Sequence, residues 1–283
     1  RRGNLDAVTE VQARQRGHQV RHRYLIRDRQ VRALALDPHG FFISNFFTLS
    51  ARLRLLLEPF VAAEHEDETV AAFARRRFGR EFLDYVINPL VGGLYAGDPE
   101  RLSVTAAFPQ LKHLEREHGS VIGGLLKRRL RRGAAAPFHP ANRMLFSFQG
   151  GLATLPHALA RRLGRRIALG HRVEAVSPQR RGFRIGVRRG IERMHFTADS
   201  VVLALPAYAA AGIVAPLDDS VGAVLADIPH PPLSVVFLGY RRRDIAHPLD
   251  GLGVLAPAIE RRRVLGILFS STLFAGRAPE DHV

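Results

Sequence analysis

The stretch Arg80–Ser103 reads REFLDYVINPLVGGLYAGDPERLS and is the most informative run in the chain. Its first half predicts a helix from Glu81 towards Leu90, because apolar residues recur there at helical spacing. These apolar residues are Phe82, Leu83, Val86 and Ile87. The run therefore predicts helical structure, and the segments around it indicate how far the helical region extends.

Helices are predicted on both sides of this run, over residues 50–132. Asp67 is expected to cap a helix that ends at Gly79, with acidic residues at its start and three arginines at its end, as the helix dipole favours. Two more helices are expected over 109–119 and 120–132, and the second ends in basic residues. These segments together form a basic, amphipathic, mostly helical block.

Strands are predicted before and after the helical block. They cover residues 23–26, 31–36, 144–148, 167–176, 183–188, 191–197, 201–205, 232–240, 252–255 and 264–270. Helices are expected between them at residues 152–163 and 208–214. Strands that alternate with helices in this way indicate an α/β domain, here with some α+β elements.

The uncharged run 201–217 invites a transmembrane interpretation. Pro206, Gly212 and Pro216 interrupt it, and it is short for a span of about 20 residues. We therefore expect a buried strand, a turn and a helix in this run.

Composition limits the kind of protein. The 283 residues allow one large domain or two smaller ones, and 46% hydrophobic residues can build a core. Cysteine is absent, which excludes disulfides, thiolate metal sites and a cysteine nucleophile. No nucleophile elbow, phosphate-binding loop or zinc spacing is present.

The net charge of +16 comes almost entirely from arginine, since only Lys112 and Lys127 are lysines. Part of this excess is expected from GC-rich coding. The remainder indicates an anionic partner such as nucleic acid, a membrane surface or an acidic ligand. No recognised nucleic-acid module accompanies the charge, so we expect no nucleic-acid partner. A non-catalytic basic module that binds a membrane or nucleic acid stays open as an alternative.

Three shorter motifs follow Arg80–Ser103, and together with it they resemble the oxygen-dependent protoporphyrinogen oxidase family, including its bacterial coproporphyrinogen-oxidising branch. These motifs are Ala107-Phe108-Pro109, Leu114-Glu115 and His118-Gly119-Ser120. Other stretches agree in order: Arg23-Tyr24-Leu25, Leu53–Pro59, Val70–Arg80, Gly150-Gly151-Leu152, Gly251–Pro257, and Leu265–Ser271 with Phe274 and Arg277. The resemblance covers nearly the whole chain from about Arg23 onward.

The resemblance implies an FAD-dependent, amine-oxidase-like flavoprotein fold with a helical, membrane-associated domain. Residues 1–49 would lead into the substrate domain, 50–139 would be the helical domain, 140–215 the middle of the FAD domain, and 216–283 the substrate-binding sheet. The Gly-x-Gly-x-x-Gly turn for the FAD pyrophosphate is absent from the sequence. We therefore expect a chain truncated at both ends that by itself binds FAD poorly, and DNA upstream of Arg1 that encodes the missing turn.

The activity implied by the resemblance is the oxidation of protoporphyrinogen IX to protoporphyrin IX in haem biosynthesis, with FAD as cofactor and dioxygen as oxidant. Oxidation of coproporphyrinogen III to coproporphyrin III is the alternative, and a count of basic residues does not separate the two. Because the flavin performs the hydride chemistry, the protein need supply only binding and orientation. A cytoplasmic protein, peripheral on an anionic membrane, is expected, with a homodimer left open.

The resemblance also implies roles for five residues. Arg23 matches the position that pairs with a substrate carboxylate, which a guanidinium suits. Leu255 and Leu268 match residues that line the ring pocket, and Gly93 matches a glycine beside the tetrapyrrole centre. Val173 matches a strand residue whose backbone meets the adenine of FAD. The alternatives are a surface charge for Arg23, core leucines, a helix-ending Gly93 and a buried strand residue for Val173.

Overall fold

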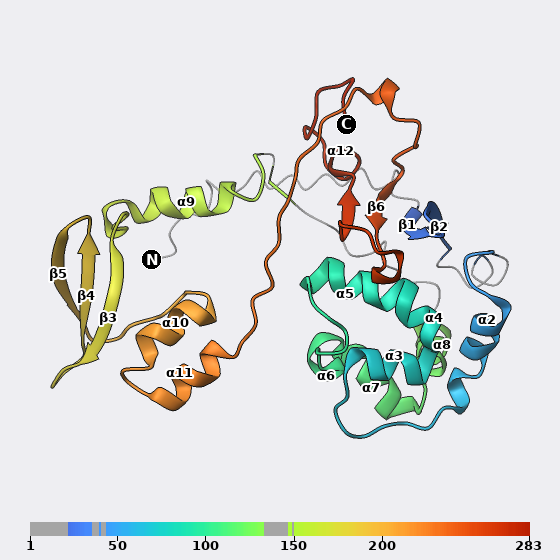
Figure 1. Cartoon of the computed structure of the whole chain (residues 1–283), viewed down its shortest axis with the longest axis horizontal. Helices are drawn as coiled ribbons and strands as arrows, with labels where there is room; N and C mark the ends of the chain where they lie inside the picture. The colour runs from blue at the N-terminus through green and yellow to red at the C-terminus, as the bar shows by residue number, and fades with distance from the viewer. Residues whose placement is uncertain (1–21, 36–39, 41–43, 133–146, 149) are drawn as a thin grey trace. The chain divides into compact units, whose positions relative to one another are not determined.

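The computed structural model describes residues 22–35, 40, 44–132, 147–148 and 150–283. The chain divides into two compact units (Figure 1). The first unit combines residues 1–151 with 233–283, and the second comprises residues 152–232. The first unit is therefore built from two segments that lie far apart in the sequence, with the second unit inserted between them.

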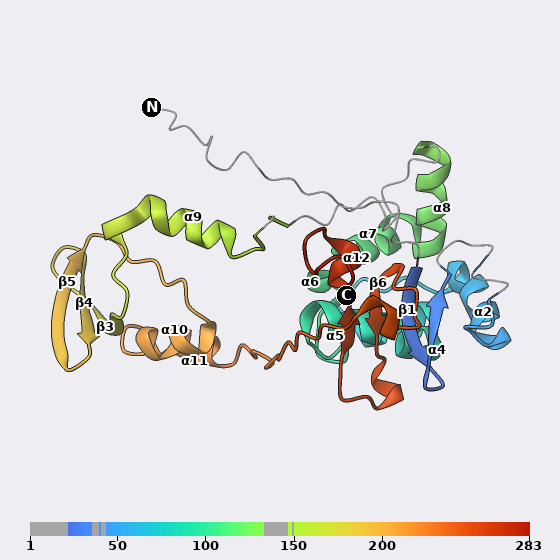
Figure 2. The same ribbon diagram turned by 90° about the horizontal axis from the view of Figure 1, so that it is seen from above.

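The first unit contains a four-stranded sheet in the order β2-β1-β6-β7. β1 (His22–Arg27) and β2 (Gln30–Leu34) form an antiparallel hairpin, and β6 (Gly251–Leu255) and β7 (Gly266–Leu268) form a second antiparallel pair. β1 runs parallel to β6, which joins the two hairpins (Figure 2). The predicted strands at 23–26, 31–36, 252–255 and 264–270 are confirmed, and their ends differ from the predicted ends by at most two residues.

The helical block belongs to the first unit. Its elements are α2 (Leu49–Leu56), η2 (Glu58–Phe60), α3 (Val70–Phe78), α4 (Arg80–Phe82), η3 (Leu83–Ile87), α5 (Asn88–Tyr95), α6 (Val104–Ala107), α7 (Pro109–His118) and α8 (Val121–Arg132). Their buried apolar side chains form one core that includes Phe73, Val91 and Leu114. The helix predicted from Glu81 is thus confirmed and continues through η3 and α5 to Tyr95.

The start of α3 differs from the prediction. Thr69, not Asp67, caps this helix, and its side chain accepts a hydrogen bond from the Ala72 backbone N–H. Asp67 instead accepts one from the Thr105 backbone N–H, because the chain turns so that its carboxylate faces α6. The end of α3 at Gly79, which has a φ of 91°, is as predicted.

One side of the sheet packs against the helical block, and we call it the helix-facing side. Leu25 of β1 is buried there with Phe46 and Phe47, and Leu34 and Leu255 pack against the same cluster. The opposite side carries Tyr24 and lies against α12 (Ser270–Leu273) and the residues before β6. Because side chains alternate along a strand, Arg23 and Leu25 share the helix-facing side.

The second unit contains an antiparallel three-stranded sheet. β3 (Arg172–Pro178), β4 (Phe183–Arg189) and β5 (Glu192–Ala198) pair in sequence order, which confirms the predicted meander. α9 (Thr154–Leu163) and η5 (Gly164–Arg166) precede the sheet, and α10 (Ala207–Val214) and α11 (Asp219–Ala226) follow it.

Two strand predictions are wrong, and one lies partly outside the described residues. Residues 201–205 join no sheet, and Val202 is 89% exposed. Residues 232–240 are also unpaired as a strand. An apolar run forms a buried strand only where neighbouring strands complete its hydrogen bonds. Among the described residues, no strand pairs with either run, and only Tyr240, at the end of the second run, exchanges backbone hydrogen bonds, with Val283. In the predicted strand 144–148, only Ser147 and Phe148 are described, and neither is in a strand.

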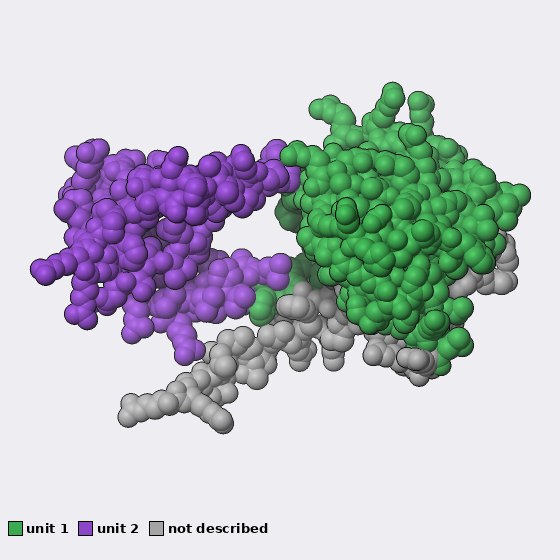
Figure 3. Space-filling model, turned by 90° about the horizontal axis from the view of Figure 1, so that it is seen from below, with its two compact units in different colours: residues 1–151, 233–283 green, residues 152–232 purple. Residues whose placement is uncertain are grey.

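The four predicted domain ranges stay a prediction. The ranges 1–49 and 50–139 fall in the first unit, while 140–215 and 216–283 each cross a boundary between the units (Figure 3). Within the described ranges, no helix is both long enough and apolar enough to cross a membrane.

Candidate substrate-binding surface

Arg23 is a partly buried cation on β1. No hydrogen bond or ion pair to its guanidinium is found among the described residues, and burial lowers its pKa. Arg27, on the same side of the same strand, instead pairs with Glu81 over 2.6 Å and lies over the Tyr85 ring. Arg27 thus has a carboxylate partner within the fold, whereas the guanidinium of Arg23 can donate hydrogen bonds to an external carboxylate.

The sheet register connects Arg23 to both predicted pocket leucines. Leu25 lies beside Leu255, and Gly253 pairs with Leu268 across β6 and β7. Side chains at paired positions point to the same side of a sheet. Arg23, Leu255 and Leu268 therefore occupy three neighbouring strands on the helix-facing side.

Gly93 lies inside α5 and faces Leu255. A Cβ atom at Gly93 would lie 3.1 Å from Leu255 Cδ2, which is closer than an ordinary van der Waals contact. The helix ends later, at Ala96, which has a φ of 47°. The alternative of a helix-ending glycine is therefore wrong, and the close approach of α5 to β6 is what this position requires.

Leu255 and Leu268 differ in how far they are buried. Leu255 is half-buried against the helical block, whereas Leu268 is 71% exposed. The default reading of Leu268 as a buried core leucine is therefore wrong. Leu268 therefore gives the helix-facing side of β7 an exposed apolar side chain that a ligand can contact.

Val173 lies in the second unit, on β3. Its side chain is partly exposed, which makes the alternative of a buried strand residue wrong. β3 is an edge strand of its sheet, with β4 on one side only. The backbone along its other edge carries no strand partner within the described part of the chain, as an adenine contact through the backbone requires.

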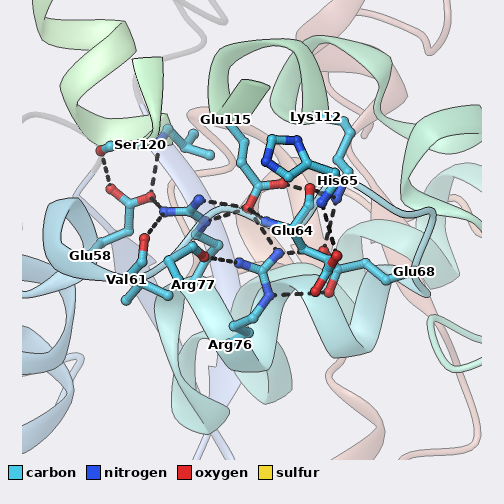
Figure 4. Close-up of polar contacts among 12 residues, drawn as sticks. Glu58, Val61, Glu64, His65, Glu68, Arg76, Arg77, Lys112, Glu115 and Ser120 are labelled. Atoms are coloured by element: carbon cyan, nitrogen blue, oxygen red, sulfur yellow. Dashed lines mark hydrogen bonds and ion pairs between the residues drawn. The ribbon is translucent and has the colours of Figure 1, made fainter. Parts of the chain in front are cut away.

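A buried ionic cluster in the helical block was not predicted from the sequence (Figure 4). Arg77 is fully buried between two carboxylates: its Nε donates to Glu115 Oε1 over 2.7 Å and its Nη1 to Glu58 Oε1 over 3.2 Å. Lys112 Nζ lies 3.0 Å from Glu115 Oε2, and Arg76 Nη2 lies 2.8 Å from Glu115 Oε1. The cluster joins α3 and α7 to η2.

Glu58 also anchors the start of α8. Its carboxylate accepts hydrogen bonds from the Ser120 hydroxyl over 2.5 Å and from the backbone N–H groups of Val121 and Ile122. Although burial by itself raises the pKa of Glu115, hydrogen bonds from Lys112, Arg76 and Arg77 outweigh it and hold that pKa at about 2. Glu115 therefore acts in structure, not in proton transfer, and Glu58 ties η2 to the start of α8.

The comparison with protein families decides the broad identity of the chain. The model of the flavin-containing amine oxidoreductases matches residues 5–283. The chain belongs to this family. Its flavin is FAD, as expected from the sequence.

Relatives within this flavin-containing family are named protoporphyrinogen oxidases. The mitochondrial enzyme of Nicotiana tabacum is 31% identical over 92% of this chain and 57% of its own length. The chloroplastic enzyme 1 of Arabidopsis thaliana is 31% identical over 77% of this chain and 43% of its own, and the human enzyme is 31% identical over 79% and 47%. This chain spans about half the length of these relatives.

A solved structure supports the same amine-oxidoreductase fold. A crystal structure from Exiguobacterium sp. 255-15, of a protein assigned as a protoporphyrinogen oxidase, superposes with a TM-score of 0.69 at 17% identity. It covers 93% of this chain and 57% of that chain. At this identity the match shows the fold alone.

The fit of FAD to this member of the family is partial. The edge of β3 at Val173 suits the adenine, but the described residues contain no glycine-rich turn for the pyrophosphate. Gly151, before α9, instead closes a turn, with its N–H donating to the Phe148 carbonyl over 2.9 Å. The contact of Val173 with the cofactor therefore stays a prediction.

Proposed function

We propose that the chain is the substrate-holding part of an FAD-dependent oxidase that converts protoporphyrinogen IX to protoporphyrin IX with dioxygen as the terminal oxidant. The observation that carries the proposal is the partly buried guanidinium of Arg23, which has no counter-ion among the described residues and shares one side of the sheet with the exposed Leu268 of β7. The names of the relatives support it.

The chemistry of the substrate fits this surface. A porphyrinogen is a large apolar macrocycle that carries carboxylates, so it needs an apolar wall and at least one cation. Leu255 and Leu268 supply the wall, Arg23 supplies the cation, and Gly93 leaves room at the centre. Bound FAD supplies the hydride acceptor, and these residues hold and orient the ring beside it.

Coproporphyrinogen III is the less favoured substrate. It carries more propionates than protoporphyrinogen IX and would use more cations. Arg23 is the one site arginine that the sequence assigns to a propionate, and Arg27 is already engaged by Glu81. The relatives described above are all named for protoporphyrinogen, which favours that substrate.

The test replaces Arg23 in the flavin-loaded protein. Arg23→Ala should weaken protoporphyrinogen binding about ten- to a hundredfold, as expected for loss of a charge-assisted hydrogen bond. Arg23→Lys should recover only part, since an ammonium lacks the planar fork. Steady-state kinetics, followed by porphyrin fluorescence, give the KM, and flavin absorbance gives the FAD content, which should not change.

Arg262 provides the matched control, because it is exposed on the loop between β6 and β7. Arg27 is unsuitable, since its loss would break the pair with Glu81, and Arg21 lies outside the described residues. Equal KM values for Arg23→Ala and Arg262→Ala would show that the carboxylate contact lies elsewhere.

We also propose that the helical block rests on an anionic membrane, at the cytoplasmic face. α2 carries exposed Leu49, Leu53 and Leu56 at helical spacing, and α8 carries exposed Leu126 and Leu130 one turn apart. Both helices lie at the same end of the first unit (Figures 1 and 2). Exposed apolar stripes among arginines suit the headgroup region of an anionic bilayer.

A further inference from the structure

The two residues that flank Arg23 both contact one carboxylate. The Tyr24 hydroxyl donates to Asp250 Oδ1 over 2.5 Å, and His22 Nε2 lies 3.6 Å from Asp250 Oδ2. Asp250 directly precedes β6, so these contacts join β1 to β6 on the side of the sheet away from the helical block. Arg23, between the two, points to the helix-facing side.

The pairing of β1 with β6 is irregular at the same place. His22 lies beside Gly251 and Tyr24 beside Val254, so β6 contains one residue more than β1 across this interval. A β-bulge bends the local backbone and changes the direction of the side chains there. The extra residue belongs to β6, whereas Arg23 keeps a regular register with Leu34 of β2, so the bulge shapes the strand against which Arg23 lies.

The turn that presents Asp250 is held from several sides. Arg242 donates hydrogen bonds to three carbonyl oxygens within residues 245–248, at 2.6, 3.1 and 3.3 Å. Thr272 Oγ1 donates to the Leu249 carbonyl over 2.6 Å. Leu249 itself has a φ of 55°, a left-handed conformation that persists only where surrounding contacts enforce it. The fold therefore fixes the position of Asp250.

The contact between Tyr24 and Asp250 joins a neutral donor to a charged acceptor. Burial, and then the hydrogen bond to Asp250, raise the pKa of Tyr24 to about 12, and the same hydrogen bond lowers the pKa of Asp250. The Tyr24 ring also packs edge-on against His247, with centroids 4.6 Å apart. Charge-assisted hydrogen bonds of this kind are short and roughly twice as strong as neutral ones.

We propose that Asp250 is a positioning residue: through Tyr24 and His22 it fixes the stretch of β1 that aims Arg23 at the substrate carboxylate. This inference rests on the proposed function, because it requires Arg23 to bind that carboxylate. It goes beyond that function by assigning a positioning role to residues on the opposite side of the sheet, where neither Asp250 nor Tyr24 touches the substrate surface.

The first test is Tyr24→Phe in the flavin-loaded protein, which removes the hydroxyl and keeps the ring packed on His247. The KM for protoporphyrinogen IX should rise about three- to tenfold, as expected for one lost hydrogen bond, with kcat and FAD content unchanged. Asp250→Ala should have at least the same effect. Asp250→Asn should restore part of the affinity, since its amide oxygen still accepts from Tyr24.

The deciding test repeats Tyr24→Phe in an Arg23→Ala background. Because both changes act through one guanidinium, the second should add less than about twofold to the KM. An equal effect in both backgrounds would overturn the inference, since Tyr24 would then act independently of Arg23. If Arg23→Ala raised the KM and Tyr24→Phe left it unchanged, the inference would be overturned and the proposed function would stand. A harmless Arg23→Ala would overturn the proposed function, and the inference with it.

Discussion

At the scale of single residues, burial separates arginines that look alike in the sequence. Arg75, Arg76 and Arg77 stand in a row at the end of α3, and the helix dipole alone would account for all three. Arg75 is exposed and pairs with Glu100 over 2.6 Å, whereas Arg77 is buried between Glu58 and Glu115. The burial of Arg77 could have been predicted from its position in the sequence, because Arg77 falls on the apolar face of α3 with Phe73 and Phe78.

This contrast supplies a matched pair of variants. Arg77→Met should destabilise the protein by about 3–5 kcal/mol, because it leaves Glu58 buried without its counter-ion and removes one of the three cations around Glu115. Arg75→Met removes a solvent-exposed pair and should change the free energy of unfolding by at most about 1 kcal/mol. Urea unfolding followed by circular dichroism measures both. Similar losses for the two variants would contradict a structural role for the buried cluster.

At the scale of elements, the sequence predicted what local patterns determine. Helical spacing located α3, α4 with η3, and α7, and turn residues bounded the meander of β3 to β5. It could not show that residues 201–205 and 232–240 form no strand in the described structure, because pairing depends on segments far away in the sequence. For the same reason, only the resemblance placed Arg23 and Leu268 in one pocket. The bulge in β6 opposite Arg23 could not be predicted from the sequence either.

The contact of α5 with β6 gives a prediction at this scale. Gly92→Ala and Gly93→Ala should gain similar helix propensity, up to about 1 kcal/mol each. At Gly92 the new Cβ would make an ordinary contact, 3.7 Å from Leu265 Cδ2, but at Gly93 it would crowd Leu255 at 3.1 Å. We therefore expect Gly93→Ala to raise the KM for protoporphyrinogen and Gly92→Ala to leave it unchanged. Identical kinetics for the two variants would show that Leu255 yields freely or lies outside the pocket.

At the scale of the whole molecule, the charge of +16 and the exposed leucines of the helical block predict salt-dependent binding to lipid. The protein should co-sediment with phosphatidylglycerol vesicles at low salt, and less with phosphatidylcholine vesicles or at high salt. Leu53→Gln combined with Leu126→Gln should weaken this binding. Ile191→Gln, in the exposed turn between β4 and β5 of the second unit, is the control and should not. Absence of binding to anionic vesicles at low salt would remove the membrane proposal.

The parallel pairing of β1 with β6 also governs when the first unit can form during synthesis. Tyr24 and Asp250 are 226 residues apart, so β1 leaves the ribosome long before its partner exists. At about 5–20 residues per second, this delay is roughly ten to fifty seconds. During that time Leu25 and the apolar side chains of the helical block lack part of their covering, while the inserted second unit can fold locally. Nascent chains of this protein should therefore depend on chaperones until Leu255 emerges.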